Sequence, residues 1–269
     1  MDNPWLKYGL GGASKVHSDD LAMFEQVNTR ILRKKTNSLD FLLSENNVPL
    51  PYFGNPNANF VVLYANPGLD RKSTHLEETP EGQKLFDLSR RHELKEPHPF
   101  VFLHPILEGT PGQRWWTQTL GSILTRFSES PNRVLENILS VEYHPYKSVK
   151  FEALTKSEGH FPTSQYSYDL VARAIDRGAL VLVSRAKKQW FDAVPELRSY
   201  SRVIYLSSAQ NSKISPNNVR YVDNPHVPDI DDQKNLAWQL ITKVALSLQP
   251  GDTGLPGELD RYIKAYRTL

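Results

Sequence analysis

Short runs of hydrophobic residues recur along the chain, each bounded by turn residues, and they alternate with longer segments of helical periodicity. The clearest run spans 60–65, between Asn59 and a turn of sequence Asn-Pro-Gly. An unbroken apolar run of this length is typical of a strand covered on both faces in a parallel sheet. Three later runs, in which most residues are apolar, are also predicted as strands, at 138–143, 179–184 and 202–206.

Other segments place their hydrophobic residues at helical spacing. The first follows a Ser-Asp-Asp capping sequence and carries Leu21, Phe24, Val27 and Ile31 on one face. Strands that alternate with helices predict an α/β fold, here a three-layer α/β/α sandwich around a central parallel sheet of about four strands. The remaining helices are predicted over 81–94, 112–127, 164–177, 186–193 and 231–248.

The length of 269 residues suits one domain, and the 39% of hydrophobic residues is enough to fill a core. We predict a single domain over 1–269, with a helical extension at about 1–48, a polar segment at about 71–99 and a helical tail at about 250–269. The polar segment is interpreted as an insertion or lid rather than core. The absence of cysteine excludes disulfides, a thiol nucleophile and a cysteine-ligated cluster.

The rest of the composition indicates the setting of the protein rather than its activity. No apolar run approaches the roughly 18 residues that span a bilayer, and the first residues do not resemble a signal peptide, so we expect a cytoplasmic protein without a membrane partner. A net charge of +2 is too small to indicate nucleic-acid binding by itself. Without metal-ligand spacing, a Walker loop or a Gly-x-Ser-x-Gly elbow, no metal and no cofactor is expected.

Three short motifs lie at or near the ends of predicted elements. The first, Ala65-Asn66-Pro67-Gly68-Leu69, follows the first predicted strand. The second is Phe100-Val101-Phe102-Leu103-His104-Pro105, followed by Arg114-Trp115-Trp116. The third, Ser207-Ser208-Ala209-Gln210, follows the last predicted strand. In this order they resemble the uracil-DNA glycosylase superfamily, most closely its mismatch-specific uracil and thymine glycosylase branch.

The resemblance spans roughly 50–241 and departs from the branch at identifiable positions. The branch has Gly-Ile-Asn-Pro-Gly-Leu, of which this chain lacks the first Gly and the Ile. It has Gln113 where the branch has Asn before Arg-Phe-Trp, and Gln210 where the branch has the Arg of Ser-Ser-Ala-Arg. The resemblance implies a glycosylase fold and an enzyme that flips a base out of duplex DNA and cleaves its glycosidic bond. Duplex DNA is therefore the expected partner, and no obligatory protein partner is expected.

The resemblance assigns the catalytic role to Asn66. An amide has no useful basicity, so Asn66 would orient the attacking water without deprotonating it. The glycosidic bond would then break largely before the water attacks, with fixed dipoles and DNA phosphates stabilising the sugar cation. This predicts a monofunctional glycosylase that leaves an abasic site. Asp70 is the alternative base, or else the N-cap of the segment that follows it.

Around Asn66, the resemblance implies a pocket for the extruded base. Phe102 matches the ring on which the branch stacks the base, although an aromatic residue in a Phe-x-Phe segment also suits the core. His144 follows a predicted strand and is either a donor to the base or a packed side chain. Trp115 and Trp116 are interpreted as core residues of their helix. The expected pocket residues are Ala65, Pro67, Gly68, Leu69, Phe102, His104 and His144.

Basic and small polar residues at strand ends are the expected contacts to DNA phosphates. The third motif has side chains small enough for backbone N–H groups to approach a phosphate. Gln210 occupies the position of the residue that fills the gap left by the flipped base, and Asn211 or Ile214 are alternatives for that role. The expected DNA-binding residues are Lys147, Ser148, Arg185, Lys187, Ser207, Ser208, Ala209, Gln210, Asn211 and Lys213, and Lys188 is a further candidate.

Gly68 directs the choice of substrate. The classical uracil branch has a bulky Tyr at this position that excludes substituents at C5 of the pyrimidine, and Gly68 leaves that space open. We therefore favour a 5-substituted pyrimidine, such as a hypermodified cytosine of phage DNA, over plain uracil. Gly68 is also interpretable as a turn glycine with positive φ. The alternatives are a uracil or mismatched-thymine repair glycosylase, a non-catalytic module that binds modified DNA, and a nucleotide-binding α/β protein.

Overall fold

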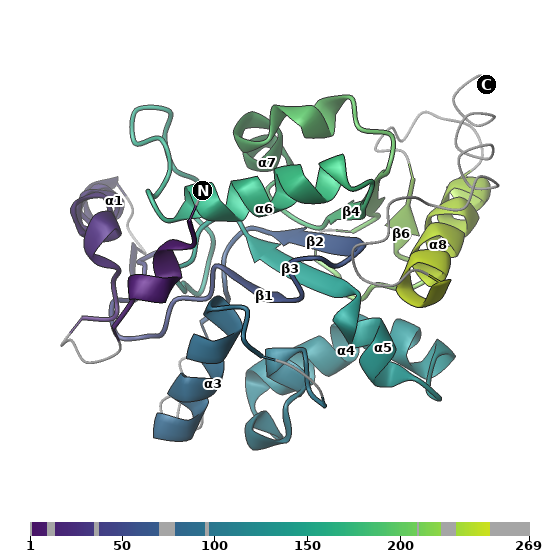
Figure 1. Ribbon diagram of the computed structural model, residues 1–269. Coiled ribbons are helices and arrows are strands. Elements are labelled where there is room, and N and C mark those ends of the chain that lie inside the picture. The colour runs from purple at the N-terminus through teal and green to yellow at the C-terminus, as the bar shows by residue number, and fades with distance from the viewer. Residues whose placement is uncertain are drawn as a thin grey trace.

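The computed structural model describes residues 2–9, 14–34, 38–69, 79–94, 97–208, 210–221 and 230–247. These residues form a mixed α/β fold around one six-stranded sheet, in the order β1-β3-β2-β4-β5-β6, with helices on both of its faces (Figure 1). Asp70, Ala209 and the predicted C-terminal tail lie outside the described residues. So do residues 71–78, 95 and 96 of the polar segment.

The four strands predicted from the hydrophobic runs are confirmed, and they pair in parallel at the centre of the sheet. Their side chains are nearly all buried, as a strand covered on both faces requires. They are β2 (Phe60–Tyr64), β3 (Ile138–Glu142), β4 (Leu180–Val183) and β5 (Val203–Leu206).

Two short edge strands make the sheet mixed, so the expectation of a four-stranded parallel sheet is wrong in this respect. β1 (Tyr52–Gly54) pairs antiparallel with β3, and β6 (Val219–Arg220) pairs antiparallel with β5. Neither has the length or the unbroken apolar run that identifies the central strands. β1 also follows a proline-rich stretch that predicts irregular structure.

The predicted helices are present, with boundaries shifted by a few residues. Two of the helices, α3 and α4, begin at a threonine N-cap that is followed by proline. The Thr79 side chain accepts a hydrogen bond from the backbone N–H of Gly82, and that of Thr110 accepts one from the backbone N–H of Gln113. One short helix, α5, was not predicted because six residues are too few to show a period. The helices are α1 (Leu21–Lys34), α3 (Pro80–Arg90), α4 (Pro111–Arg126), α5 (Pro131–Glu136), α6 (Ser164–Asp176), α7 (Lys187–Ala193) and α8 (Ile230–Ser247).

Single turns of 3-10 helix connect these elements. The Phe-x-Phe-x-His-Pro motif forms two of them, η4 and η5, rather than extended chain. The turns are η1 (Pro4–Lys7), η2 (Ser18–Asp20), η3 (Ser38–Asp40), η4 (Val101–Leu103), η5 (Pro105–Leu107) and η6 (Pro195–Arg198).

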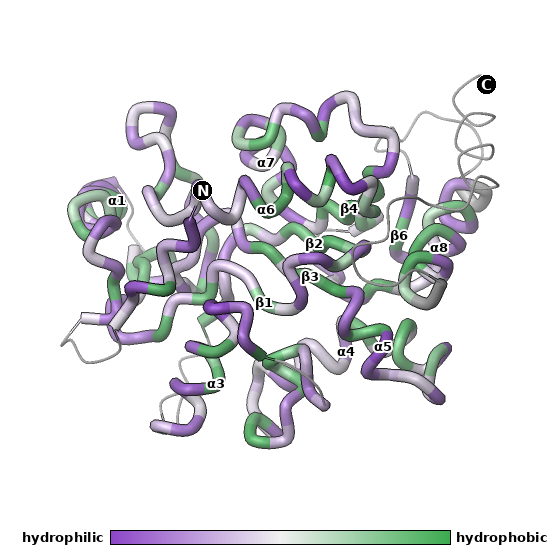
Figure 2. The backbone as a smooth tube through the Cα atoms, viewed as in Figure 1, coloured by the Kyte–Doolittle hydropathy of each residue, from purple (hydrophilic) through white to green (hydrophobic). Residues whose placement is uncertain are grey.

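Side-chain alternation along the strands divides the core into two hydrophobic clusters, one on each face of the sheet. Phe60, Val62 and Tyr64 belong to the cluster that includes α4 and α8, whereas Val61 and Leu63 belong to the cluster that includes α6 and α7. Figure 2 shows the hydrophobic segments concentrated on the central strands. No helix in the described part of the chain has the length and hydropathy needed to cross a bilayer.

The N-terminal extension is held to the rest of the fold by a buried polar contact. Asp20 accepts hydrogen bonds from the Tyr146 hydroxyl and from both the backbone N–H and the hydroxyl of Thr163. Phe24 of α1 packs edge-on against the Tyr146 ring, with centroids 5.0 Å apart. The extension therefore shares a core with residues more than a hundred positions away.

The described part of the polar segment is not a lid. Leu85 and Phe86 of α3 are buried in the cluster beside the sheet. Arg90 is fully buried and donates a hydrogen bond to the Pro49 carbonyl. The interpretation of this stretch as lying outside the core is therefore wrong for α3. Most residues of α3 are polar, but its few apolar residues lie on the face that packs against the sheet.

Candidate active site

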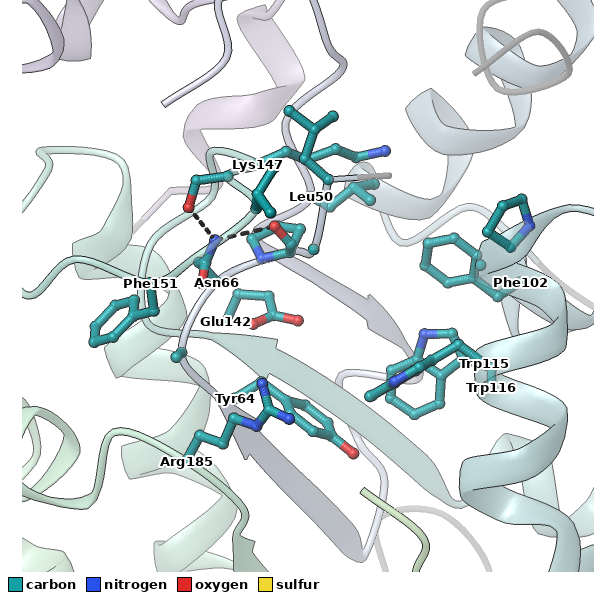
Figure 3. A pocket seen from close by; sticks show the side chains of 18 of the residues that line it. Leu50, Tyr64, Asn66, Phe102, Trp115, Trp116, Glu142, Lys147, Phe151 and Arg185 are labelled. Atoms are coloured by element: carbon teal, nitrogen blue, oxygen red, sulfur yellow. Dashed lines mark hydrogen bonds between the residues drawn. The ribbon is translucent and has the colours of Figure 1, made fainter. Parts of the chain in front are cut away.

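A cavity of about 580 Å³ opens at the carboxyl ends of β2 and β3. This is the edge where open α/β sheets bind ligands, because each strand ends there in a loop whose side chains are free of the sheet. Figure 3 shows Phe102, Trp115 and Trp116 on one side of the cavity, Asn66 and Phe151 on the other, and Glu142 between them. The predicted residues that line it are Ala65, Asn66, Pro67, Gly68, Leu69, Phe102, Lys147, Ser148 and Arg185.

The Asn66 amide is held in one orientation. Its Nδ2 donates to the carbonyl of Pro67 at 3.0 Å and to the Ser148 hydroxyl oxygen at 2.8 Å (Figure 3). A carbonyl can only accept, and the Ser148 hydroxyl donates its own hydrogen to the Lys150 carbonyl at 2.9 Å. Both partners therefore require the nitrogen of Asn66, which leaves Oδ1 as an acceptor without a hydrogen bond among the described residues.

Ser148 has a different role from the one expected of it. It is only 1% exposed, and its hydroxyl is engaged by both Asn66 and Lys150. A buried hydroxyl with these two partners is not placed to contact a DNA phosphate. Ser148 instead orients the Asn66 amide, and a backbone bridge between Gly68 and Ser148 holds the two loops together.

The aromatic wall of the cavity comes from α4 and η4. Trp116 and Phe102 are 3% and 6% exposed, and both pack edge-on against Phe53. Trp115 is 36% exposed, and it contacts the Tyr64 ring edge-on with centroids 5.4 Å apart. The prediction of a core position is confirmed for Trp116 and wrong for Trp115, because the helix turns Trp115 toward the cavity rather than toward the sheet.

Glu142 lines the cavity and was missed by the sequence reasoning. It is the last residue of β3 and lies beside Tyr64 of β2 in the sheet register. Burial raises the pKa of its carboxyl to about 8, although the positive charge of Arg185 acts in the opposite direction. The available signal was a carboxylate inside an otherwise uncharged strand of sequence Ile-Leu-Ser-Val-Glu.

Three basic residues line the cavity, Lys147, Lys150 and Arg185. Lys150 pairs with Asp40 at 3.0 Å. Lys147 is buried, whereas Arg185 follows β4 and is exposed. The next two lysines point their charges elsewhere: the Lys187 ammonium lies over the Phe191 and Tyr205 rings, and Lys188 pairs with Asp192 at 2.6 Å. Neither lysine lines the cavity.

The two histidines expected in the pocket lie outside it. His104 accepts a hydrogen bond at Nδ1 from the backbone N–H of Ile106, which caps η5. His144 is fully buried with its ring stacked on Phe151, and burial lowers its pKa to about 3. The prediction that these two histidines contact the base is therefore wrong. His104 caps a turn, and His144 is a neutral ring that packs against Phe151 of the cavity wall.

The loop after β5 uses its polar groups internally. The backbone N–H of Ser207 donates to the Asn218 carbonyl, and that of Ser208 donates to the Asn218 side chain. The Asn218 amide donates in turn to the Asn211 and Lys213 carbonyls. The backbone N–H groups of Ser207 and Ser208, which were predicted to bind a phosphate, are therefore already hydrogen-bonded within the protein.

The remaining residues of this loop divide by exposure. Gln210, Asn211 and Lys213 are exposed, and none of them lines the cavity. Ile214 is fully buried in the core, so it is not the side chain that fills the gap of a flipped base.

Gly68 does not have the positive φ expected of a turn glycine. Apart from its two chain neighbours, a Cβ atom at this position would meet no heavy atom of the described residues within 4 Å. Gly68 therefore faces open space at the cavity, and a small side chain is sterically allowed there.

The comparisons with known proteins do not add a family. Searches with the chain match no family model, no curated protein and no solved structure. Among the described residues, no three side chains of His, Asp or Glu converge in a way that would hold a metal ion.

Proposed function

We propose that the chain is a monofunctional DNA glycosylase that excises a modified pyrimidine, with a preference for a 5-substituted cytosine. The observation that carries the proposal is the Asn66 amide, which is locked at the end of β2 with its Oδ1 available as an acceptor. In the proposed reaction Oδ1 accepts a hydrogen bond from the attacking water and aims it at C1′ of the sugar. The three motifs that resemble the uracil-DNA glycosylases support this role, and with it a three-layer fold of that kind.

The cavity offers the other parts that such a reaction needs. Its volume of about 580 Å³ lies within the range of small-molecule sites and has room for a pyrimidine with a substituent. The half-exposed Trp115 supplies a ring face on which a base can stack, a role in which it replaces the more buried Phe102. Lys147 and Arg185 supply positive charge at the cavity for the phosphates beside the flipped nucleotide.

The bond breaks first in this mechanism, because no group at Asn66 can deprotonate the water. The positive charge that develops on the sugar is stabilised by the DNA phosphates and by fixed dipoles of the cavity. No lysine forms a Schiff base in the proposed reaction, so the product is an intact strand with an abasic site.

The test is an assay of base release from duplexes that carry uracil, mismatched thymine, 5-hydroxymethylcytosine or its glucosylated form. We expect release of the 5-substituted cytosines, and strand breaks only after alkali or heat. Release of uracil or thymine alone would favour a repair glycosylase. Tight binding of modified DNA without release of any base would favour a binding module, and trapping by borohydride would contradict the monofunctional mechanism.

A further inference from the structure

A row of polar side chains crosses the sheet beneath the cavity. Glu142 and Tyr64 are register partners on β3 and β2, and Ser184 directly follows Val183, the partner of Leu63 on β4. Since side chains alternate along a strand, the three point to the same face of the sheet. This last row, where the strands reach the cavity, is polar on all three strands, whereas the row before it consists of Val62, Ser140 and Leu182.

Within this row, Glu142 has hydrogen-bonding capacity that the fold does not use. Its side chain is 5% exposed and lines the cavity, yet its Oε2 has no hydrogen-bond partner among the described residues. An unpaired buried polar atom destabilises the folded protein, and an unpaired buried charge destabilises it more. Such an arrangement in a ligand cavity suggests that the partner is supplied by the ligand.

Burial keeps the Glu142 carboxyl neutral near pH 7, against the effect of the positive charges around it. Tyr64 on β2 is an uncharged phenol whose own pKa is raised by burial. Arg185 after β4 and Lys147 after β3 line the same cavity and are positively charged. Burial outweighs the effect of Arg185 and raises the pKa of Glu142 to about 8, so the carboxyl carries a proton that it can donate.

We propose that Glu142 is the acid that protonates N3 of a 4-aminopyrimidine in the cavity, which selects cytosine-type bases over uracil-type bases. The proposal rests on the proposed glycosylase function. A neutral carboxyl matches the cytosine edge with two hydrogen bonds, since its O–H donates to N3 and its carbonyl accepts from the 4-amino group. Uracil carries a hydrogen on N3 and offers no site there for a proton.

Protonation at N3 addresses the main difficulty of releasing cytosine. When the bond between C1′ and N1 breaks, its electron pair stays on N1, and the departing base would be an anion. The proton moves from Glu142 to N3, so the base leaves as neutral cytosine in its 3H form and Glu142 becomes a carboxylate. Water oriented by Asn66 adds to C1′, and the proton that this water loses to solvent restores the acid. General acid catalysis of this kind contributes typically 10²–10⁴-fold.

The test compares two bases that share a 5-substituent and differ only at C4. Single-turnover release of 5-hydroxymethylcytosine and 5-hydroxymethyluracil from matched duplexes is measured for the wild type, Glu142→Gln and Glu129→Gln. The glutamine at 142 keeps the size and both hydrogen bonds but has no acidic proton. Glu129 is exposed after α4 and controls for the loss of a glutamate. Melting of each variant and its binding to abasic DNA show that the fold and the DNA grip are intact.

We expect Glu142→Gln to slow release of 5-hydroxymethylcytosine by about 100-fold or more and release of 5-hydroxymethyluracil by less than about 10-fold, while Glu129→Gln changes neither. Equal losses on both bases, or no loss on either, would overturn the role of Glu142 and leave the glycosylase proposal standing. Wild-type release of 5-hydroxymethyluracil without 5-hydroxymethylcytosine would do the same. A wild type that releases no base from any duplex would overturn both proposals.

Discussion

Two regions of the molecule place small polar residues at the carboxyl ends of parallel strands, and they differ in what those residues have left to offer. At the ends of β2 and β3, Oδ1 of Asn66 and Oε2 of Glu142 have no hydrogen-bond partner in the part of the chain that the structure describes. In the loop after β5, the side chain and carbonyl of Asn218 take up the N–H groups of Ser207 and Ser208. Position at a strand end is therefore not enough to make a site, because unused hydrogen-bonding capacity is also needed.

The largest effect is expected at Asn66. Asn66→Ala should reduce base release by about 1000-fold, at the upper end of the losses seen when one preorganised dipole is removed, and leave DNA binding within several-fold. Ser148→Ala is the matched variant: it removes one of the two partners of Nδ2 and should cost about 10-fold through looser orientation of the amide. Single-turnover rates and DNA affinities measure both. Full activity of Asn66→Ala would show that the open acceptor plays no part in catalysis.

The next effect is expected at Gly68. Gly68→Tyr should lower release of a 5-substituted cytosine by about 100-fold, a loss of the order expected when binding energy of a few kcal/mol is removed by a clash, while any uracil release survives. Gly68→Ala is the control, since a Cβ at this position meets open space and φ is not positive. It should melt like the wild type and keep its activity. Equal loss of uracil and bulky-base release in Gly68→Tyr would show that Gly68 does not set the limit at C5.

The dependence of stability on pH separates Glu142 from two histidines, His92 and His144. Burial raises the pKa of Glu142 from 4.5 to about 8, so the folded protein retains a proton that the unfolded chain loses above pH 4.5. The contribution of Glu142 to the free energy of unfolding is therefore largest at low pH and declines as the pH rises toward 8. His92 and His144 have pKa values lowered to about 4 and about 3, so they act in the opposite direction and only below about pH 6.5.

Between pH 6.5 and 8, the free energy of unfolding of the wild type should therefore decline relative to that of Glu142→Gln, by up to about 1.4 kcal/mol per pH unit. Urea unfolding at several pH values measures this difference, with Glu129→Gln as the control that should follow the wild type. Parallel curves for the wild type and Glu142→Gln would mean that the carboxyl is already ionised in the folded protein.

The smallest effects are expected on DNA binding and in the loop after β5. Arg185→Ala should reduce the slope of log affinity against log salt by about one, because each neutralised phosphate releases about 0.9 counterions. Lys188→Ala should leave the slope unchanged, since Lys188 pairs with Asp192.

Ser208→Ala should change base release by less than about two-fold, as its N–H is bonded to Asn218 and the substitution keeps that N–H. A larger loss of base release in Ser208→Ala would indicate that this loop contacts the DNA after all.

The sequence by itself determined the central strands and most helices, because their signals are local. Short, mainly apolar runs identified β2 to β5, and helical periodicity identified α1, α4 and α6, with a capping sequence as a further signal for α1. It also located Asn66 at the point where β2 ends, beside the cavity. The elements that it missed, β1, β6 and α5, are too short for a period of two or 3.6 residues to be recognised.

Only the tertiary structure decided which polar groups remain unused. The partner that orients Asn66 is Ser148, 82 positions away, and no local pattern predicts that pairing. No local pattern predicts that Asn218 accepts hydrogen bonds from the N–H groups of Ser207 and Ser208, or that Trp115 faces the cavity. Glu142 is buried within the assembled sheet, beside Tyr64 of β2, so its raised pKa follows from the tertiary structure rather than from its place in the sequence.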